Sequence, residues 1–224
     1  MTASSRDQFL HLVDWRRRVF SLYDEVRAAP EPEAGWEAWR DGRDDLFAAH
    51  PQSPLTTEGR AAFEGIDYFP YRPDARVTAT VVEAEAPHYD IATSGGSSFS
   101  FTRWATAGFE LEGTELALEL YWFDGYGGGL FVPFRDLTSG HQTYGAGRYL
   151  LDTVKGADLG TVDDKLVLDF NFAYNPSCAY DPKWVCPLAP PPNRLAVAIE
   201  AGEKDPAKTS GAPAEQTDID AATR

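Results

Sequence analysis

The sequence predicts an α+β fold in which N-terminal helices pack on an antiparallel, barrel-like sheet of about eight to nine strands. Apolar side chains recur at the helical period over roughly the first 50 residues, and the pattern changes to strict alternation from about residue 75 onward. A chain of 224 residues that is 43% hydrophobic is long enough to bury one sizeable core. We therefore expect a single domain over residues 1–202, with a helical part at 4–50 and a barrel-like part at 75–202.

The first expected element is an amphipathic helix over residues 4–29. Ser4 and Asp7 have the spacing of a capping box, and Pro30 cannot continue a helix. Apolar side chains recur every three or four residues between these limits. The spacing therefore predicts one long helix with a buried stripe.

A second helix is expected over residues 35–49, and a shorter one over 57–63. Trp36 and Trp39 fall on the same stripe of the second helix. Such a stripe is far more often core packing than a platform for a ligand. We therefore expect both tryptophans to pack against the sheet.

The remaining elements are expected to be strands joined by short turns rich in Gly, Asp and Ser. In the segment 115–123, Leu and Trp side chains alternate with Glu, Ala and Tyr, so one face of this strand is expected to be exposed to solvent. Closure into a barrel would remove the exposed edges that a flat sheet of this size leaves. The candidate strands are 75–85, 88–93, 98–104, 106–112, 115–123, 129–137, 147–155, 165–174 and 194–201.

The last residues, 203–224, have almost no apolar side chains and are expected to be a disordered tail. No window approaches the roughly 18 consecutive apolar residues of a membrane span, and the N-terminus lacks the order of a secretory signal. We therefore expect a soluble cytoplasmic protein without a membrane partner.

The charge balance argues against a nucleic-acid partner. The chain has 35 acidic and 20 basic residues, a net charge of −15, and binding to a phosphate backbone needs a surplus of bases. Five of the bases are lysines and fifteen are arginines. Codon bias in a GC-rich genome explains this usage better than adaptation to a salt-rich cytoplasm, which stays an alternative.

The two cysteines, Cys178 and Cys186, flank a short excursion between two expected strands. A structural zinc site needs two further Cys or His ligands nearby, and the four histidines are scattered along the chain. A disulfide is the second alternative. We expect two reduced thiols that lie close in space and hold no metal.

The candidate site lies in two motif-dense runs, 131–149 and 168–180. The guanidinium group of arginine binds small carboxylate or phosphate groups through bidentate hydrogen bonds. We therefore expect Arg135, Arg148, Asp169 and Asn171 to converge in the mouth of the barrel. The alternative is an internal Arg–Asp network that only closes the barrel. The residues expected to line the site are Arg135, Tyr144, Arg148, Tyr149, Asp169, Asn171 and Tyr174, with Asp136 nearby.

Two glycine-rich runs, 125–130 and 144–149, look at first like loops that cradle phosphate. A phosphate loop lies between a strand and a helix and ends in Lys followed by Ser or Thr, whereas both runs here lead into expected strands. Hairpin turns and close backbone approach explain them better.

These runs carry a resemblance to a known family. The blocks DYFPYRPDARV (67–77), LFVPFRDLTSGHQTYGAGRYL (130–150), LDFNFAYNPSCAY (168–180) and CPLAPPPNRLAVAIEAGEK (186–204) resemble the domain of unknown function family 1684 of bacterial and archaeal proteins, over roughly residues 5–204. The resemblance implies a single domain and a motif-dense patch but no substrate. Mapped onto this chain, the patch consists of Arg135, Asp136, Thr138, Ser139, Gly140, Thr143, Tyr144, Gly145, Gly147, Arg148, Tyr149, Asp169, Asn171, Tyr174, Asn175, Cys178, Cys186, Asn193 and Arg194.

Three functions stay open from the sequence. The first is binding of a small polar or anionic molecule in the barrel mouth. The second is an enzyme of hydrolase or transferase type, with Asp169 or Asp136 as general base or Cys178 as nucleophile. The third is a structural or protein-interaction role, which would leave an exposed apolar patch and no pocket. The sequence names no cofactor and leaves the oligomeric state open.

Overall fold

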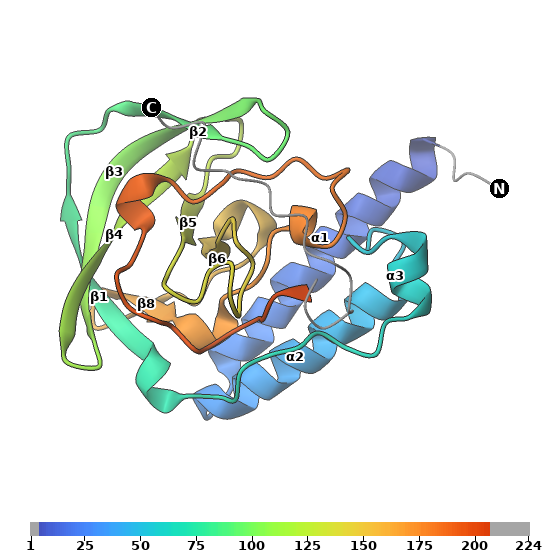
Figure 1. The fold of residues 1–224 in the computed structure, drawn as a ribbon, viewed down its shortest axis with the longest axis horizontal. Coiled ribbons are helices and arrows are strands. Elements are labelled where there is room, and N and C mark those ends of the chain that lie inside the picture. Colours follow the sequence, from blue (N-terminus) through green and yellow to red (C-terminus); the bar gives the residue numbers. More distant parts are fainter. Residues whose placement is uncertain (1–4, 207–224) are drawn as a thin grey trace.

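The computed structural model describes residues 5–206 and begins with the expected helices (Figure 1). Helix α1 spans Ser5–Ala28 and helix α2 spans Pro32–Ala49, and the two pack side by side. Pro32 starts α2 in its first turn, where a missing N–H is tolerated, so this helix begins three residues earlier than predicted. Helix α3 spans Thr57–Ala61. Ser4 of the predicted capping box lies outside the described residues.

The strands form one antiparallel sheet that curls into an incomplete barrel (Figure 1). Its order is β6-β5-β4-β3-β1-β8-β7, and β2 pairs with part of β3. Strand β1 pairs with β8 through its first half and with β3 through its second half. The strands are β1 Arg76–Glu83, β2 His88–Ala92, β3 Ser98–Leu111, β4 Thr114–Phe123, β5 Leu130–Phe134, β6 Arg148–Asp152, β7 Thr161–Val162 and β8 Lys165–Asp169.

The α+β class and the barrel-like sheet are therefore confirmed, but two predicted strands differ. The segments 98–104 and 106–112 form one continuous strand, β3, with a bulge at Trp104 that interrupts the register. The segment 194–201 is not a strand. It runs beside the residues that follow β5, through an isolated parallel bridge between Arg135 and Arg194. The proline-rich residues before it cannot supply a ladder of N–H donors.

The core lies between the two long helices and the concave face of the sheet. The aromatic stripe of α2 is buried in it, as predicted. Trp39 is fully buried, and its ring centre lies 5.1 Å from that of Phe172, which follows β8. Trp36 donates a hydrogen bond from its indole nitrogen to the carbonyl oxygen of Asn171 at 3.0 Å. This hydrogen bond and the contact between Trp39 and Phe172 hold helix α2 against the segment after β8.

The C-terminal segment is part of the fold further than predicted. Glu203, placed by its sequence in the expected tail, is fully buried, and its backbone N–H donates to Ala173. Asp205 is also buried. The boundary at residue 202 is therefore too early, while residues 207–224 lie outside the described residues.

Candidate functional site

Arg148 lies in the interior of the protein and not in an open mouth. It is 1% exposed, and it donates to an Asp136 carboxylate oxygen at 2.7 Å. The same guanidinium donates to the backbone carbonyls of Ile199, Ala201 and Glu203. Burial lowers the pKa of Arg148, and the charge of Asp136 opposes that shift. The arginine thus ties β6 to the C-terminal segment.

The loop after β5 holds Asp136 in place. The Asp136 carboxylate oxygen that does not contact Arg148 accepts hydrogen bonds from the backbone N–H of Thr138 at 2.6 Å and from the hydroxyl of Thr138. That hydroxyl also lies 2.8 Å from the hydroxyl of Thr143. The FRDLTSG and TYG motifs therefore contact each other in a turn that supplies hydrogen-bond donors to a buried carboxylate.

Asp169 and Asn171 belong to a separate network at the end of β8. Asp169 is fully buried and accepts from the guanidinium of Arg76 at 3.1 Å and from the side-chain amide of Asn171 at 2.8 Å. The Asn171 side chain also bonds to both backbone groups of Arg72. Burial raises the pKa of Asp169, and the bonds from Asn171 and Arg76 oppose that rise.

The structure does not bring Arg135, Arg148, Asp169 and Asn171 together as predicted, although Asp169 and Asn171 do bond to each other. The prediction assumed that the strands at 147–155 and 165–174 pair along their length. Instead β6 pairs with β5, β8 pairs with β1 and β7, and the two segments share an isolated bridge between Tyr149 and Tyr174. Arg148 lies opposite Phe134 in the β5–β6 ladder, with its guanidinium carbon 5.2 Å from the Phe134 ring centre. Arg135 is the next residue after Phe134, so alternation turns it to the other face.

Arg135 lines a cavity of about 190 Å³ together with Arg194. Its walls come from β2, which contributes Tyr89, Asp90 and Ile91, and from the loop 188–191. Backbone hydrogen bonds hold the two arginine-bearing segments together: the Arg135 N–H donates to Asn193 and the Leu195 N–H donates to Arg135. We call this space the Arg135–Arg194 cavity. Of the predicted ligand-binding residues, only Arg135 lines it.

Two of the predicted tyrosines, Tyr144 and Tyr149, lie near the two cysteines. Tyr149 is 3% exposed, and its hydroxyl donates to the Pro187 carbonyl at 2.5 Å. Tyr174 packs edge-on against Tyr149, with ring centres 5.7 Å apart. The hydroxyl of Tyr144 donates to the sulfur of Cys178 at 3.8 Å.

The sequence did not predict one buried ion pair, between Arg43 and Glu203. Arg43 of α2 donates from two nitrogens to one carboxylate oxygen of Glu203, and both side chains are nearly covered. The other oxygen accepts from the Asn175 N–H at 2.7 Å and from the Tyr180 hydroxyl at 2.8 Å. The one available signal was the GEK ending of the last family-like block, which includes Glu203.

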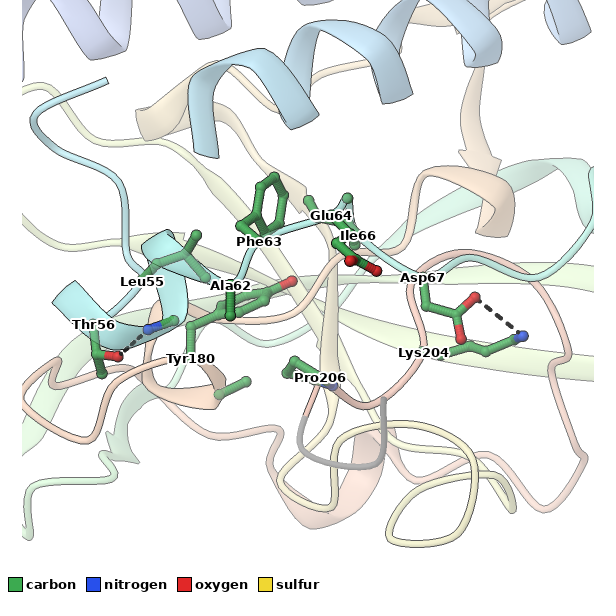
Figure 2. A pocket seen from close by; sticks show the side chains of 13 residues that line it. Leu55, Thr56, Ala62, Phe63, Glu64, Ile66, Asp67, Tyr180, Lys204 and Pro206 are labelled. Atoms are coloured by element: carbon green, nitrogen blue, oxygen red, sulfur yellow. Dashed lines mark hydrogen bonds and ion pairs between the residues drawn. The ribbon is translucent and has the colours of Figure 1, made fainter. Parts of the chain in front are cut away.

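A second, larger cavity of about 450 Å³ lies between α3 and the C-terminal segment. Figure 2 shows the Tyr180 ring between the side chains of Phe63 and Pro206, with an ion pair between Asp67 and Lys204 at one end. Glu64 also lines the space, so its acids outnumber its bases. This charge does not suit an anion.

No group of three or more His, Cys, Asp or Glu side chains is arranged to hold a metal ion in residues 5–206. No helix of that range is long and apolar enough to cross a lipid bilayer.

A family model described as "Protein of unknown function (DUF1684)" matches residues 61–204. The chain belongs to this family. A solution NMR structure of an uncharacterized protein from Haloarcula marismortui is 40% identical to this DUF1684 protein, with a TM-score of 0.58. That match covers 77% of this chain and 93% of the other. No curated protein matches the chain. The family match includes both arginines of the Arg135–Arg194 cavity and leaves out α1 and α2.

Proposed function

We propose that this DUF1684 protein binds a small anion in the Arg135–Arg194 cavity. The observation that carries the proposal is local charge. Two arginines and one acid, Asp90, line this cavity, so basic side chains outnumber acidic ones there although the net charge of the chain is −15. A recess lined by more basic than acidic side chains attracts anions from solution.

The size of the cavity limits the ligand. Its 190 Å³ is below the roughly 300–1,000 Å³ of pockets that hold drug-sized ligands, so the proposed ligand has the size of phosphate or a small carboxylate. Guanidinium groups bind both kinds of anion through paired N–H donors. Tyr89 adds an aromatic wall.

Rigid surroundings support the positions of both arginines. The side-chain amide of Asn193 donates to the carbonyls of Glu119 and Pro133, and its oxygen accepts from the Glu119 N–H. Asn193 lies next to Arg194 and is fully buried. A site held by ordered backbone loses less entropy when its ligand binds.

The test is the thermal stability of the full chain in sodium phosphate, sodium sulfate or sodium acetate, against sodium chloride at equal ionic strength. An anion at about 100 times its Kd should add about 2.7 kcal/mol of stability. For a protein of this size that corresponds to a rise in Tm of roughly 5–11 °C.

Arg135→Gln and Arg194→Gln should each remove most of this rise. Arg17→Gln is the matched control, because Arg17 is an exposed arginine of α1 whose side chain is 70% exposed. An equal anion effect in all three variants and the wild type would show nonspecific ion binding and contradict the proposal. So would the absence of any effect with all three anions.

The enzyme alternative has weaker support. A general base must reach its substrate, whereas the carboxylates of Asp136 and Asp169 are covered and already bonded. Neither residue lines either of the two cavities described above. An interaction role is favoured by one observation, the exposed apolar side chains of Phe9, Leu10 and Val13 on α1.

A further inference from the structure

Cys178 and Cys186 come from separate segments that the fold brings together. Cys178 lies in the short 3₁₀ helix Ser177–Ala179, after Tyr174 has paired with β6. Cys186 is anchored beside the end of β2: its N–H donates to the hydroxyl of Ser94 at 3.1 Å, and its carbonyl accepts from the Ser94 N–H at 3.0 Å. The predicted closeness of the two cysteines is confirmed.

The two thiols are neighbours. Each is free, and the thiol of Cys186 lies within hydrogen-bonding reach of the Cys178 sulfur. The hydroxyl of Tyr144 also donates a hydrogen bond to the Cys178 sulfur, at 3.8 Å. Two donors therefore converge on one sulfur atom, which is an arrangement that stabilises a thiolate.

The two thiols differ in protonation and in access. The bond from Cys186, aided by that from Tyr144, lowers the pKa of Cys178 to about 6. The same bond raises the pKa of Cys186. Cys178 is partly exposed and Cys186 is 7% exposed. The other charged or titratable groups that act on this cluster are Tyr149, Lys155 and Asp205.

We propose that Cys178 and Cys186 form a site that a small hydroperoxide oxidises to a reversible intramolecular disulfide. Cys178 is the attacking thiol, because it is the less buried of the two and its sulfur receives hydrogen bonds from Tyr144 and Cys186. Cys186 is the resolving thiol, because it lies against that sulfur and keeps its proton. The site is separate from the Arg135–Arg194 cavity and does not depend on the proposed anion binding.

The reaction has two steps. In the first, written for hydrogen peroxide, the Cys178 thiolate attacks one peroxide oxygen, the O–O bond breaks, and hydroxide leaves and takes up a proton to become water. In the second, the Cys186 sulfur attacks the resulting sulfenic acid. The S–S bond forms as the S–O bond breaks, and the departing hydroxide takes the Cys186 proton. Two thiols lose two electrons, and one peroxide becomes two waters.

The test treats the reduced full chain with hydrogen peroxide at pH 6 and follows free thiols and intact mass. Thiolate fraction and the weaker nucleophilicity of an acidic thiol together predict that Cys178 reacts about tenfold faster than free cysteine at this pH. The product should be a monomer that has lost two hydrogen atoms and both titratable thiols, and dithiothreitol should restore them. The chain has only these two cysteines and one methionine, Met1, so oxygen added at Met1 is separated by peptide mapping.

Cys186→Ser should stop at the sulfenic acid, which dimedone traps on Cys178. Cys178→Ser should give neither dimedone adduct nor disulfide. Circular dichroism establishes that each variant is folded, and Cys178→Ala and Cys186→Ala replace any that is not. The proposal is wrong if wild-type thiols persist after free cysteine in the same solution has been consumed, if the product is a disulfide-linked dimer, or if the two single variants react at equal rates.

Discussion

At the scale of single residues, Arg148 decides between the two interpretations of the motif-dense patch. Its charge is met by Asp136 and three carbonyls in the interior, which is the geometry of an internal network. Arg148→Met should leave Asp136 buried and unpaired, so we expect a loss of about 3–5 kcal/mol in the free energy of unfolding in urea. Arg17→Met should change it by no more than about 0.5 kcal/mol. A variant that keeps wild-type stability yet no longer responds to phosphate would make Arg148 a ligand residue instead.

The sequence indicated that Asp169 and Asn171 lie close together, but not which residues they pair with. They bond to each other and both are buried, because the chain turns into a 3₁₀ helix at Phe170 that the Asp169 side chain caps. The partner of Asp169 is Arg76, which is 93 residues away in sequence. Local periodicity contains no information about such a long-range pairing.

At the scale of elements, sequence periodicity predicted the helices and most strands, and it failed where strands end. Strands β5, β6 and β8 are each shorter than predicted. The residues beyond β5 and β8 enter turns whose polar side chains bond to the local backbone, and β6 leads into the 3₁₀ helix Thr153–Lys155. The bulge at Trp104 explains why β3 reads as two strands, since one extra residue reverses the alternation of faces.

The packing of α2 on the segment after β8 gives an element-scale prediction. Trp39 is fully buried between Tyr23 of α1 and Phe172, so Trp39→Ala should lower the free energy of unfolding by about 3–5 kcal/mol through the cavity it leaves. Phe9→Ala is the control, because Phe9 is 71% exposed on α1 and its loss should be nearly neutral. Equal effects in urea denaturation would mean that α2 is not packed as described.

At the scale of the whole molecule, the incomplete barrel is covered by segments from both ends of the described chain. The concave face packs against α1 and α2, and the C-terminal segment crosses in front of the sheet (Figure 1). The aromatic stripe of α2 in the sequence predicted that the helices cover the sheet. The sequence could not predict the second cover, because residues 203–205 are charged and look like part of a solvated tail. We propose that the two covers and the sheet form the single domain that the sequence led us to expect.

The Arg43–Glu203 ion pair joins these two covers and tests that proposal. Arg43→Met or Glu203→Leu alone should lower the free energy of unfolding by about 3–5 kcal/mol, since each leaves one buried charge without its partner. The double variant should recover much of this loss, because two apolar side chains can pack where the ions were. The matched surface pair, Arg17 and Asp14, should show a coupling of no more than about 1 kcal/mol. In every variant, unfolding followed by tryptophan fluorescence and by far-ultraviolet circular dichroism should coincide, because one cooperative unit gives one transition. Two separated transitions, or additive single losses, would mean that the helices and the C-terminal segment are not coupled through this pair.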